Sequence, residues 1–535
     1  MSVHPSEPLP PIKDTHPTEI KHFEDVLVLI KPLGRWQALL FVCLAYAQYW
    51  MSMTNLAVVF FGIQPDFYCF QPDLAASNWT FEQIRNLRLA FCSYGFCHHV
   101  FDNSVDMSYT IVMQWDLVCG RQFLVEHSQM VYMAGFLVGS FSSGAISDRF
   151  GRKYPFIVSV LLFTVCGVLQ AFTPTYAAFL AIRFFMAFFN IASWMTGFCL
   201  ALEVITNKWR VWIGGLFFFP YALGYTSLAG FAYWLRDWRT MHWVISVPCV
   251  ICVVFFWLMD ESPRWLLVKG RTREAEKILR KAARFNGVQL PEHINMQAMA
   301  ETVAREAQEE AAKQVSFLEV FKHRTITIRA FNLFFNWFVN SAVYYGVSLN
   351  VNEFDGNRFV NNAIAGAVEI PAYMLCVPFL FWGRRRSLVS TLLGAGVSLL
   401  IVGFLPANLS ALKTTLAMVG KFCITASFAI VYVHTTELYP TPVRNSGLAN
   451  SSCVARIGSI LAPYIAGISK LGSSYRWVPV LIFGGLSLGA GLLAILLPET
   501  KGKRMPDNFE EAIHLVPEEH REQPNGTELR GRYKA

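Results

Sequence analysis

Charged residues are scarce in this sequence. Asp, Glu, Lys and Arg make up 15% of its 535 residues, whereas hydrophobic residues make up 54%. Because soluble domains carry about 25% charged residues, this composition excludes an ordinary soluble domain and indicates a membrane protein. The formal net charge of +8 comes largely from short basic loops and one central segment, so it does not indicate binding of nucleic acid.

Two functional motifs are also missing, one typical of metalloproteases and one typical of ATP-driven pumps. The sequence contains no HExxH metalloprotease motif and no phosphate-binding loop of the form GxxxxGKS or GxxxxGKT. These absences argue against a membrane enzyme and against direct use of ATP, and we expect neither a cofactor nor a metal site. Cys92, Cys97, His98 and His99 lie close together, but their spacing is not that of a tetrahedral zinc site.

Long apolar stretches dominate the chain. A membrane-spanning helix needs about 20 apolar residues, and twelve stretches meet this need. They are residues 36–63, 127–147, 154–173, 175–205, 211–235, 241–259, 326–350, 360–382, 387–405, 410–437, 443–470 and 475–497. We therefore predict an all-α polytopic membrane protein with two six-helix halves, residues 36–259 and 326–497, joined by a charged linker over residues 260–325.

Basic residues predict the orientation. The segments Asp148–Lys153 and Gly383–Arg386 are short basic loops that fall on the same side of the membrane as the linker. Cytoplasmic loops carry an excess of Lys and Arg, so we expect this side to be the cytoplasm. Residues 1–35 and 498–535 are then cytoplasmic tails, and residues 1–35 lack the apolar run of a cleavable signal peptide.

One long polar loop, residues 64–126, is expected outside the cell. An Asn-Trp-Thr sequon in it predicts a glycan on Asn78. Four cysteines of this loop are disulfide candidates in an oxidising exterior, namely Cys69, Cys92, Cys97 and Cys119. Three pairings are open. The other eight of the twelve cysteines lie in apolar segments, where a thiol is usually a small buried hydrophobic group.

The two halves repeat each other's motifs. An acidic residue lies seven positions before an arginine at the end of the fourth span, at Glu203 and Arg210, and again after the tenth, at Glu437 and Arg444. The sixth span ends in Asp-Glu-Ser-Pro-Arg and the twelfth in Pro-Glu-Thr-Lys-Gly. Matching motifs at matching positions indicate a parallel duplication about an axis along the membrane normal.

Several segments together resemble a known family. The loop GAISDRFGRK at residues 144–153 resembles the signature loop of the major facilitator superfamily. ESPRWLLVKGRTREAEKILRKAARFNG, AVEIPAY, GKFCITASFAIVYVHTTELYPTPVRN and LLPETKG resemble the organic ion transporter family, solute carrier family 22. FNWFVNSAVYYGVSLN is similar to its invertebrate organic cation transporter-like and carnitine-type branches. The resemblance implies a twelve-helix, alternating-access transporter of small organic ions at the plasma membrane, although the cysteine-bearing loop is shorter here.

Two ionisable residues inside spans are candidates for substrate binding, because charge inside a membrane is costly. Arg456 lies near the middle of the eleventh span and needs a wet cavity, a carboxylate partner or an anionic substrate group. The resemblance implies an acid at this position in strongly cation-selective members and Arg in anion and carnitine-type members. Glu369 could balance Arg456 or receive a substrate amine, and Pro371, two residues further on, is expected to break the eighth span locally. A structural ion pair is the alternative for both charges.

Aromatic side chains could surround a substrate ammonium group through cation–π contacts. The candidates are Trp194, Trp337, Tyr344, Tyr345 and Tyr432. The resemblance places three of them, Trp194, Trp337 and Tyr344, at cavity positions of the family. Asn340 lies on the same predicted helix as Trp337 and could add a hydrogen bond. Packing or lipid contact is the alternative for each ring.

A second set of charged residues is expected to control conformation. These residues are predicted to lie near cytoplasmic span ends, where changing salt bridges can favour one state over another. They are Asp148, Arg149, Arg152, Arg183, Glu203, Arg210, Glu261, Arg264, Glu437, Arg444 and Glu499. Asp148 is expected to act as a latch between spans, because it lies in a loop whose glycines permit close packing.

These features predict a carrier that moves small organic ions through a midplane cavity between two halves. The expected substrate is a zwitterion or cation that bears an amine, such as a carnitine-like compound, β-alanine or carcinine. An organic anion exchanger is the main alternative and a pure cation uniporter the next, and a sensor with the same fold but no net transport also stays open. We expect a monomer in the lipid bilayer, with sodium or protons as candidate coupling ions.

Overall fold

The computed structural model describes residues 22–65, 67–70, 98–101, 107–354, 356–472 and 475–515. Most of this part is helical, and it includes a small antiparallel sheet of β1 (Phe67–Phe70) and β2 (His98–Phe101). The predicted glycosylation site Asn78 and the disulfide candidates Cys92 and Cys97 lie outside the described residues, as does the side chain of Cys69. Cys119 is disulfide-bonded, whereas the eight cysteines of the apolar segments are free.

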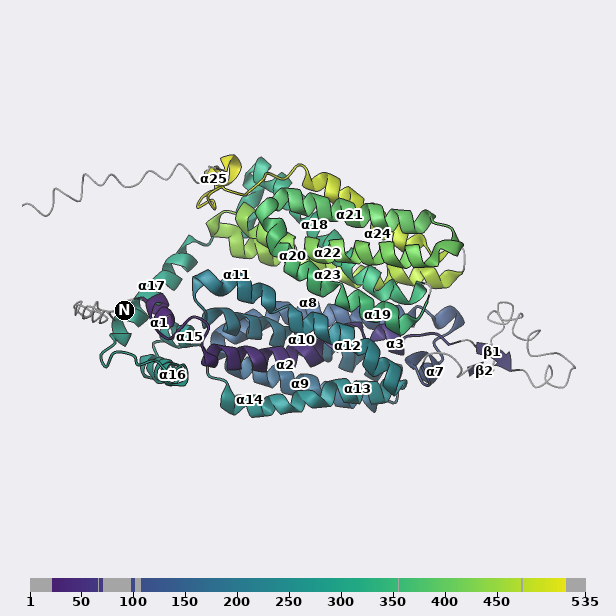
Figure 1. The fold of residues 1–535 in the computed structure, drawn as a ribbon, viewed down its shortest axis with the longest axis horizontal. Coiled ribbons are helices and arrows are strands. Elements are labelled where there is room, and N and C mark those ends of the chain that lie inside the picture. Colours follow the sequence, from purple (N-terminus) through teal and green to yellow (C-terminus); the bar gives the residue numbers. More distant parts are fainter. Residues whose placement is uncertain are drawn as a thin grey trace, which may run out of the picture.

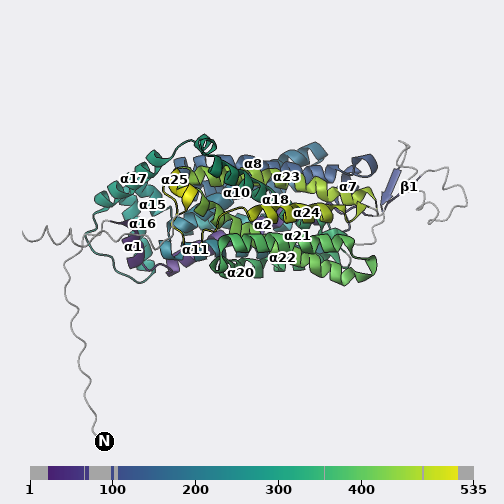
Figure 2. The same ribbon diagram turned by 90° about the horizontal axis from the view of Figure 1, so that it is seen from above.

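Each of the twelve predicted spans contains a helix, and the helices form two groups (Figure 1). The first half comprises α2 (Arg35–Leu56), α8 (Leu124–Phe150), α9 (Lys153–Ala171), α10 (Tyr176–Glu203), α11 (Asn207–Leu216) with α12 (Phe219–Leu235), and α13 (Trp238–Ser246) with α14 (Cys252–Leu258). The second half comprises α18 (Arg324–Leu349), α19 (Arg358–Ala367) with α20 (Glu369–Trp382), α21 (Arg384–Phe404), α22 (Ser410–Leu438), α23 (Arg444–Gly467) and α24 (Val478–Ala494). The helices of both halves run along one long axis (Figure 2).

The first helix of each half is not among the helical segments that are apolar enough, by composition, to cross a membrane. In the described part, nine helical segments are long and apolar enough to cross a membrane, and α24 is apolar but shorter. α2 and α18 are long enough but carry buried polar side chains, such as Asn55 on α2 and Asn336 and Asn340 on α18. Because these side chains are buried rather than exposed to lipid, α2 and α18 supply polar groups to the interior.

Three spans are interrupted near a proline; in the sixth span, the 3-10 turn η2 (Val247–Ile251), which contains Pro248, separates α13 from α14. α19 ends at Ala367 and α20 begins at Glu369. Pro371 has no backbone N–H to offer the carbonyl one turn earlier, which confirms the predicted break in the eighth span. α11 and α12 are likewise separate helices, and Pro220 lies in the first turn of α12. The break in the eighth span places Glu369 at the start of a helix inside the bundle.

The two ends of the helix bundle differ (Figure 1). At one end, which we call the linker end, lie α1 (Phe23–Leu29), α15 (Pro263–Val268), α16 (Thr272–Phe285), α17 (Met296–Lys313) and α25 (Phe509–His514). At the other, which we call the loop end, lie α3 (Val58–Phe61), α7 (Ile111–Trp115), β1 and β2. α16 buries Ala275, Leu279 and Ala282 and exposes most of its charges, as its sequence pattern predicts.

A charged corner closes the linker end of the first half, between α8 and α9. Arg152 pairs with Asp148 (Nη1–Oδ1 2.7 Å) and with Glu203 (Nη2–Oε1 2.9 Å). The carboxylate of Glu261 accepts the backbone N–H of Arg152 at 2.7 Å. Trp265 donates from Nε1 to the carbonyl oxygen of Asp148 at 3.1 Å. The corner therefore joins the ends of α8, α9 and α10 to the start of the linker.

The second half repeats this corner. Arg384 pairs with Glu437 (Nε–Oε1 3.0 Å), and Glu499 accepts the backbone N–H of Arg384 at 2.8 Å. Burial raises the pKa of the Glu499 carboxyl, but hydrogen bonds from backbone N–H groups outweigh this effect, so its pKa lies below the ordinary value. The equivalent roles of Arg152 and Arg384 support the duplication that the sequence motifs indicate.

Gly151 and Gly383 shape the two corners, with φ values of +97° and +145°. A Cβ on Gly151 would lie 2.2 Å from Oε2 of Glu261. We predict that Gly151→Ala lowers the melting temperature of the purified protein in detergent, because the left-handed backbone and the clash both disturb the corner. Gly144→Ala is the matched control, since Gly144 is helical and its Cβ would meet no described atom within 4 Å. Equal melting temperatures of the two variants would contradict this account.

Candidate functional site

A buried ion pair lies inside the second half. Nζ of Lys421 on α22 is 2.9 Å from Oε1 of Glu369 on α20, and both side chains are 0% exposed. Tyr344 of α18 donates to the same carboxylate oxygen at 2.7 Å. Lys421 also donates to Ser348 and lies 3.5 Å from the centre of the Tyr344 ring. Because a buried charge is costly without a partner, this pair is what allows Glu369 to be ionised inside the bundle.

Lys421 is a site residue that is absent from the candidates predicted from the sequence. The sequence offers Arg456 as the partner that could balance Glu369, and the structure places Lys421 there instead. Lys421 is an ionisable residue inside a predicted span, so the same criterion that singles out Arg456 also applies to it. Its pairing with Glu369 depends on how α20 and α22 are rotated against each other, which the sequence pattern does not reveal.

α18 presents a row of polar side chains one turn apart. Asn332, Asn336, Asn340, Tyr344 and Ser348 occur at every fourth position and are at most 9% exposed. The amide nitrogen of Asn340 donates to the carbonyl of Asn336 at 2.8 Å. The Oδ1 atoms of Asn336 and Asn340 are buried without a hydrogen-bond partner among the described residues. The row therefore offers unused acceptors next to the ion pair.

Four of the five candidate aromatic residues lie around this row. Trp337 donates from Nε1 to the hydroxyl of Thr435 at 2.9 Å, and its ring centre is 4.4 Å from that of Tyr432. The ring centres of Tyr344 and Tyr345 are 5.1 Å apart and nearly perpendicular. These edge-to-face contacts fix the orientation of the rings.

Trp194 belongs to a different cluster. It lies on α10 and stacks on Phe198 with a centroid distance of 5.4 Å. It also contacts Phe218, which stacks on Tyr373 of α20 at 5.2 Å. Trp194 thus connects to the second half through one intervening ring, that of Phe218.

Arg456 lies on α23, next to the same aromatic residues. It interacts electrostatically with Tyr345 and Tyr432, and its guanidinium carbon is 5.5 Å from the ring centre of Phe136 on α8. In the described part of the chain its Nε is buried without a hydrogen-bond partner, and no carboxylate forms a salt bridge with it. Tyr345 also interacts with Glu369, so the ion pair and Arg456 share a neighbour.

The first half contributes a polar cluster that reaches this region. The Tyr132 hydroxyl donates to Oδ1 of Asn55 at 2.6 Å, and Nδ2 of Asn190 donates to the same oxygen at 3.2 Å. Nδ2 of Asn55 in turn donates to the Tyr221 hydroxyl at 3.4 Å. Tyr221 interacts electrostatically with Glu369, so it links the polar groups of the two halves.

The expected cytoplasmic position of Arg183 is wrong. Arg183 lies near the start of α10, toward the loop end, and is fully buried. It donates to Oε1 of Gln129 at 2.6 Å and to the carbonyl of Ser128 at 3.2 Å, and it lies 4.6 Å from the centre of the Tyr132 ring. The fourth span runs toward the linker end, so residues at its start lie at the opposite end. Arg183 therefore supports the polar cluster of the first half.

The seven-residue spacing from acid to arginine does not mark an ion pair in either half. Glu203 and Glu437 pair with the corner arginines instead. Arg444 donates to two backbone carbonyls, at 3.2 and 3.3 Å. Arg210 lies within electrostatic reach of Arg264, Glu24 and Glu203 but forms no salt bridge with Glu203. Arg149 is exposed at the end of α8.

The two halves close against each other at the loop end. Glu126 of α8 pairs with Lys470 of η7 (Ile468–Leu471) at 2.6 Å. Beside it, Nδ1 of His127 and the hydroxyl of Tyr464 are 2.9 Å apart. The ion pairs of the linker-end corners, in contrast, each join residues of a single half. This conformation is therefore fastened at the loop end.

The segment GLSLG at residues 485–489 matches the GxSxG motif of enzymes with a nucleophilic serine, and it lies inside α24. A nucleophile elbow requires a sharp turn between a strand and a helix. Ser487 is instead buried within a helix and donates to the carbonyl of Leu392 at 2.9 Å. The pattern therefore marks a packing position.

Comparisons with known proteins identify relatives along nearly the whole chain. Residues 93–509 match the family described as Sugar (and other) transporter. An organic cation transporter protein of Drosophila melanogaster is 35% identical, and the alignment covers 95% of this chain and 98% of that protein. Organic cation/carnitine transporter 2 of Homo sapiens is 33% identical, with 95% and 97% covered. Solute carrier family 22 member 6-A of Xenopus laevis is 34% identical, with 82% and 77% covered.

Solved structures of the E. coli xylose transporter XylE have the same fold. Its inward-open conformation matches with a TM-score of 0.58 at 17% identity, covering 90% of this chain and 98% of that chain. XylE bound to 6-bromo-6-deoxy-D-glucose matches with a TM-score of 0.59 at 17% identity, with 88% and 98% covered. At this identity the likeness concerns the fold alone.

The Lys421–Glu369 pair is expected to stabilise the folded protein. Lys421→Met leaves Glu369 buried without its cation, and breaking a buried pair in this way costs about 3–5 kcal/mol. We predict a clearly lower melting temperature in detergent, and a recovery in the double variant Glu369→Gln/Lys421→Met. Lys413→Met is the matched control, because Lys413 is also buried on α22 but lies against the Trp477 ring at 3.9 Å. A double variant no more stable than Lys421→Met would contradict the ion pair.

Proposed function

The chain belongs to solute carrier family 22, the organic ion transporter family of the major facilitator superfamily, and we propose that it carries small organic ions that bear an amine, above all zwitterions. Like its relatives, it is a multi-pass membrane transporter and not an enzyme. The proposal adds the substrate class and the residues that recognise it. Carnitine-like compounds, β-alanine and carcinine-like compounds are the candidates.

The charge balance of the central region carries this proposal. Lys421 pairs with the Glu369 carboxylate, and Arg456 shares the neighbour Tyr345 with that carboxylate. Because Lys421 and Glu369 neutralise each other, one positive charge is left without a carboxylate in the described part of the chain. A substrate carboxylate would pair with Arg456 through a charge-assisted hydrogen bond and so neutralise this positive charge.

A substrate amine has partners in the same region. Oε2 of Glu369 is buried without a hydrogen-bond partner among the described residues, so it can accept from an ammonium group. Tyr344, Tyr345, Trp337 and Tyr432 provide aromatic faces for cation–π contacts. The unused acceptor on Asn340 adds a further hydrogen bond. A zwitterion would therefore place its carboxylate at Arg456 and its amine toward Glu369.

The transport cycle we propose is alternating access between residues 36–259 and 326–497. Both termini and the linker end lie in the cytoplasm, so the conformation fastened at the loop end opens toward the cytoplasm. Opening the loop end requires the Glu126–Lys470 pair to break, while the two corners at the linker end move with their own halves. The protein acts as a monomer in the plasma membrane, with sodium or protons as candidate coupling ions.

An organic anion exchanger is the second candidate function. The observation that favours it is the same excess of positive charge, because an anion without an amine would also neutralise Arg456. In that case Glu369 serves only to hold Lys421 and Tyr344 in place. A pure cation uniporter ranks third, since a cation would add to the uncompensated positive charge.

Removal of the Arg456 charge separates the substrate classes. We predict that Arg456→Ala lowers uptake efficiency for carboxylate-bearing substrates by about 10- to 100-fold, since a hydrogen bond to a charged group contributes about 1.5–3 kcal/mol. Uptake of an amine without a carboxylate should fall much less. Arg305→Ala is the matched control, because its side chain is 71% exposed in the linker. Equal loss for all substrates would assign Arg456 a structural role.

Removal of the Glu369 carboxylate tests amine recognition. Glu369→Gln/Lys421→Met takes away both charges of the pair and so avoids a lone buried cation. We predict that competitive radiotracer uptake by this variant loses its preference for a zwitterion over an anion of similar size, because the carboxylate that receives the amine is gone. An unchanged preference would show that Glu369 does not contact the amine and would favour the anion exchanger.

A further inference from the structure

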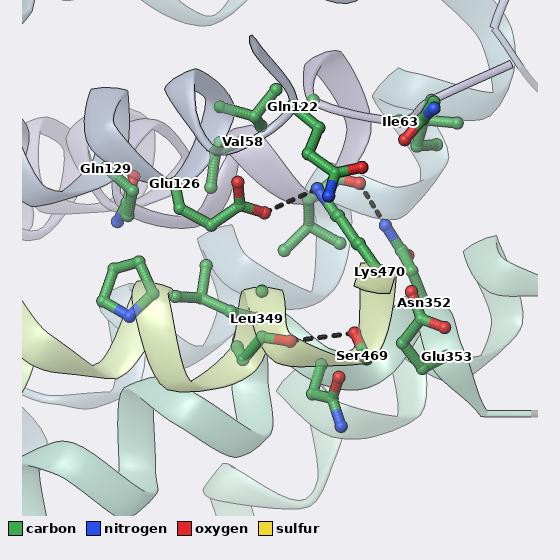
Figure 3. A pocket seen from close by; sticks show the side chains of 18 of the residues that line it. Val58, Ile63, Gln122, Glu126, Gln129, Leu349, Asn352, Glu353, Ser469 and Lys470 are labelled. Carbon is green, nitrogen blue, oxygen red and sulfur yellow. Dashed lines mark hydrogen bonds and ion pairs between the residues drawn. The ribbon is translucent and has the colours of Figure 1, made fainter. Parts of the chain in front are cut away.

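A cavity lies between the two halves at the loop end. Its volume is about 490 Å³, within the range of small-molecule sites. Its walls come from α3 and the start of α8 in the first half, and from η4 (Asn350–Glu353), the end of α23 and η7 in the second. Figure 3 shows Glu126 and Lys470 meeting in this cavity. The ion pair and Arg456 of the central region are not among its lining residues.

Several polar atoms in the wall have no partner among the described residues. Oε1 of Glu126 accepts from Lys470, but its Oε2 is buried and unpartnered. Asn350 is 2% exposed, and both atoms of its amide are unpartnered. Asn352 donates to the carbonyl of Val59, while its Oδ1 is unpartnered. The wall thus leaves three acceptor oxygens and one donor nitrogen unused.

This set of atoms selects a ligand by its hydrogen-bond donors. Each buried polar group without a partner costs about 1–3 kcal/mol, so a ligand that donates to these oxygens is favoured. The carboxylate of Glu353 also lines the cavity, whereas the cations in the wall, Lys470 and Arg358, already have partners. A primary ammonium group brings a positive charge and three N–H donors. A quaternary ammonium group brings the charge and no donor.

We propose that this loop-end cavity is a second ligand site, which binds small primary amines between Glu126 and Asn350. It differs from the proposed central site in two ways. It lacks the aromatic cluster that could hold a quaternary ammonium group. Its walls come from both halves, at the loop end where the halves close against each other. The site does not depend on which substrate the central region carries.

Ethanolamine and choline test the proposal, because they differ by three N-methyl groups. Both are titrated calorimetrically into the purified full-length protein in detergent. Ethanolamine should bind more tightly than choline, and Asn350→Leu should weaken ethanolamine binding by about tenfold through loss of a hydrogen bond. Asn362→Leu is the matched control, because Asn362 is fully buried with an unpartnered amide among the described residues and does not line the cavity.

A gain of affinity provides a readout that misfolding cannot imitate. Asn350→Asp adds a carboxylate to the wall and should bind ethanolamine more tightly than the wild type. The proposal is overturned if the wild type does not bind ethanolamine, or if neither Asn350 variant changes its affinity. It is also overturned if Glu369→Gln/Lys421→Met abolishes binding while Asn350→Leu leaves it unchanged, because the amine is then bound in the central region. Since uptake is not measured, this result is independent of the proposed transport.

Discussion

A charge inside a membrane protein must be paired, and the architecture of this carrier depends on how that requirement is met. Lys421 and Glu369 meet it inside the second half, where both are out of contact with water and only 2.9 Å apart. Tyr344 donates a further hydrogen bond to Oε1 of Glu369, and Lys421 donates one to Ser348. Because this pair neutralises itself, Arg456 is left in the central region without a carboxylate partner among the described residues. A carrier can use such a charge to recognise its substrate.

Equivalent contacts between arginines and carboxylates hold the helix ends of each half together at the linker end. Arg152 and Arg384 each tie the end of one span to an acid on another, and Glu261 and Glu499 each cap the backbone of the loop that follows a glycine. These corners hold each half together as a unit at the linker end. The contacts that join the halves at the loop end include the Glu126–Lys470 ion pair beside a cavity. Rigid halves with a breakable contact are what alternating access requires.

Much of the fold could be predicted from the sequence, because long apolar stretches and basic loops follow directly from the bilayer. The break before Pro371 could be predicted from backbone chemistry alone. The pairing of Glu369 could not, because helical periodicity does not tell how α20 and α22 face each other. Arg183 is a different case: its place at the start of the fourth span already puts it far from the linker. The repeated acid-to-arginine spacing points to the duplication but not to the ion pairs, which cross between helices.

Competitive uptake in cells that express the wild-type protein distinguishes the proposed substrate classes. The competitors are a cation, a zwitterion and an anion of similar size, each measured with and without external sodium and at two pH values. We expect the zwitterion to compete best, since it alone supplies both a carboxylate for Arg456 and an amine for Glu369. Strongest competition by the anion would contradict this expectation and would make Arg456 the sole anchor of an anion exchanger.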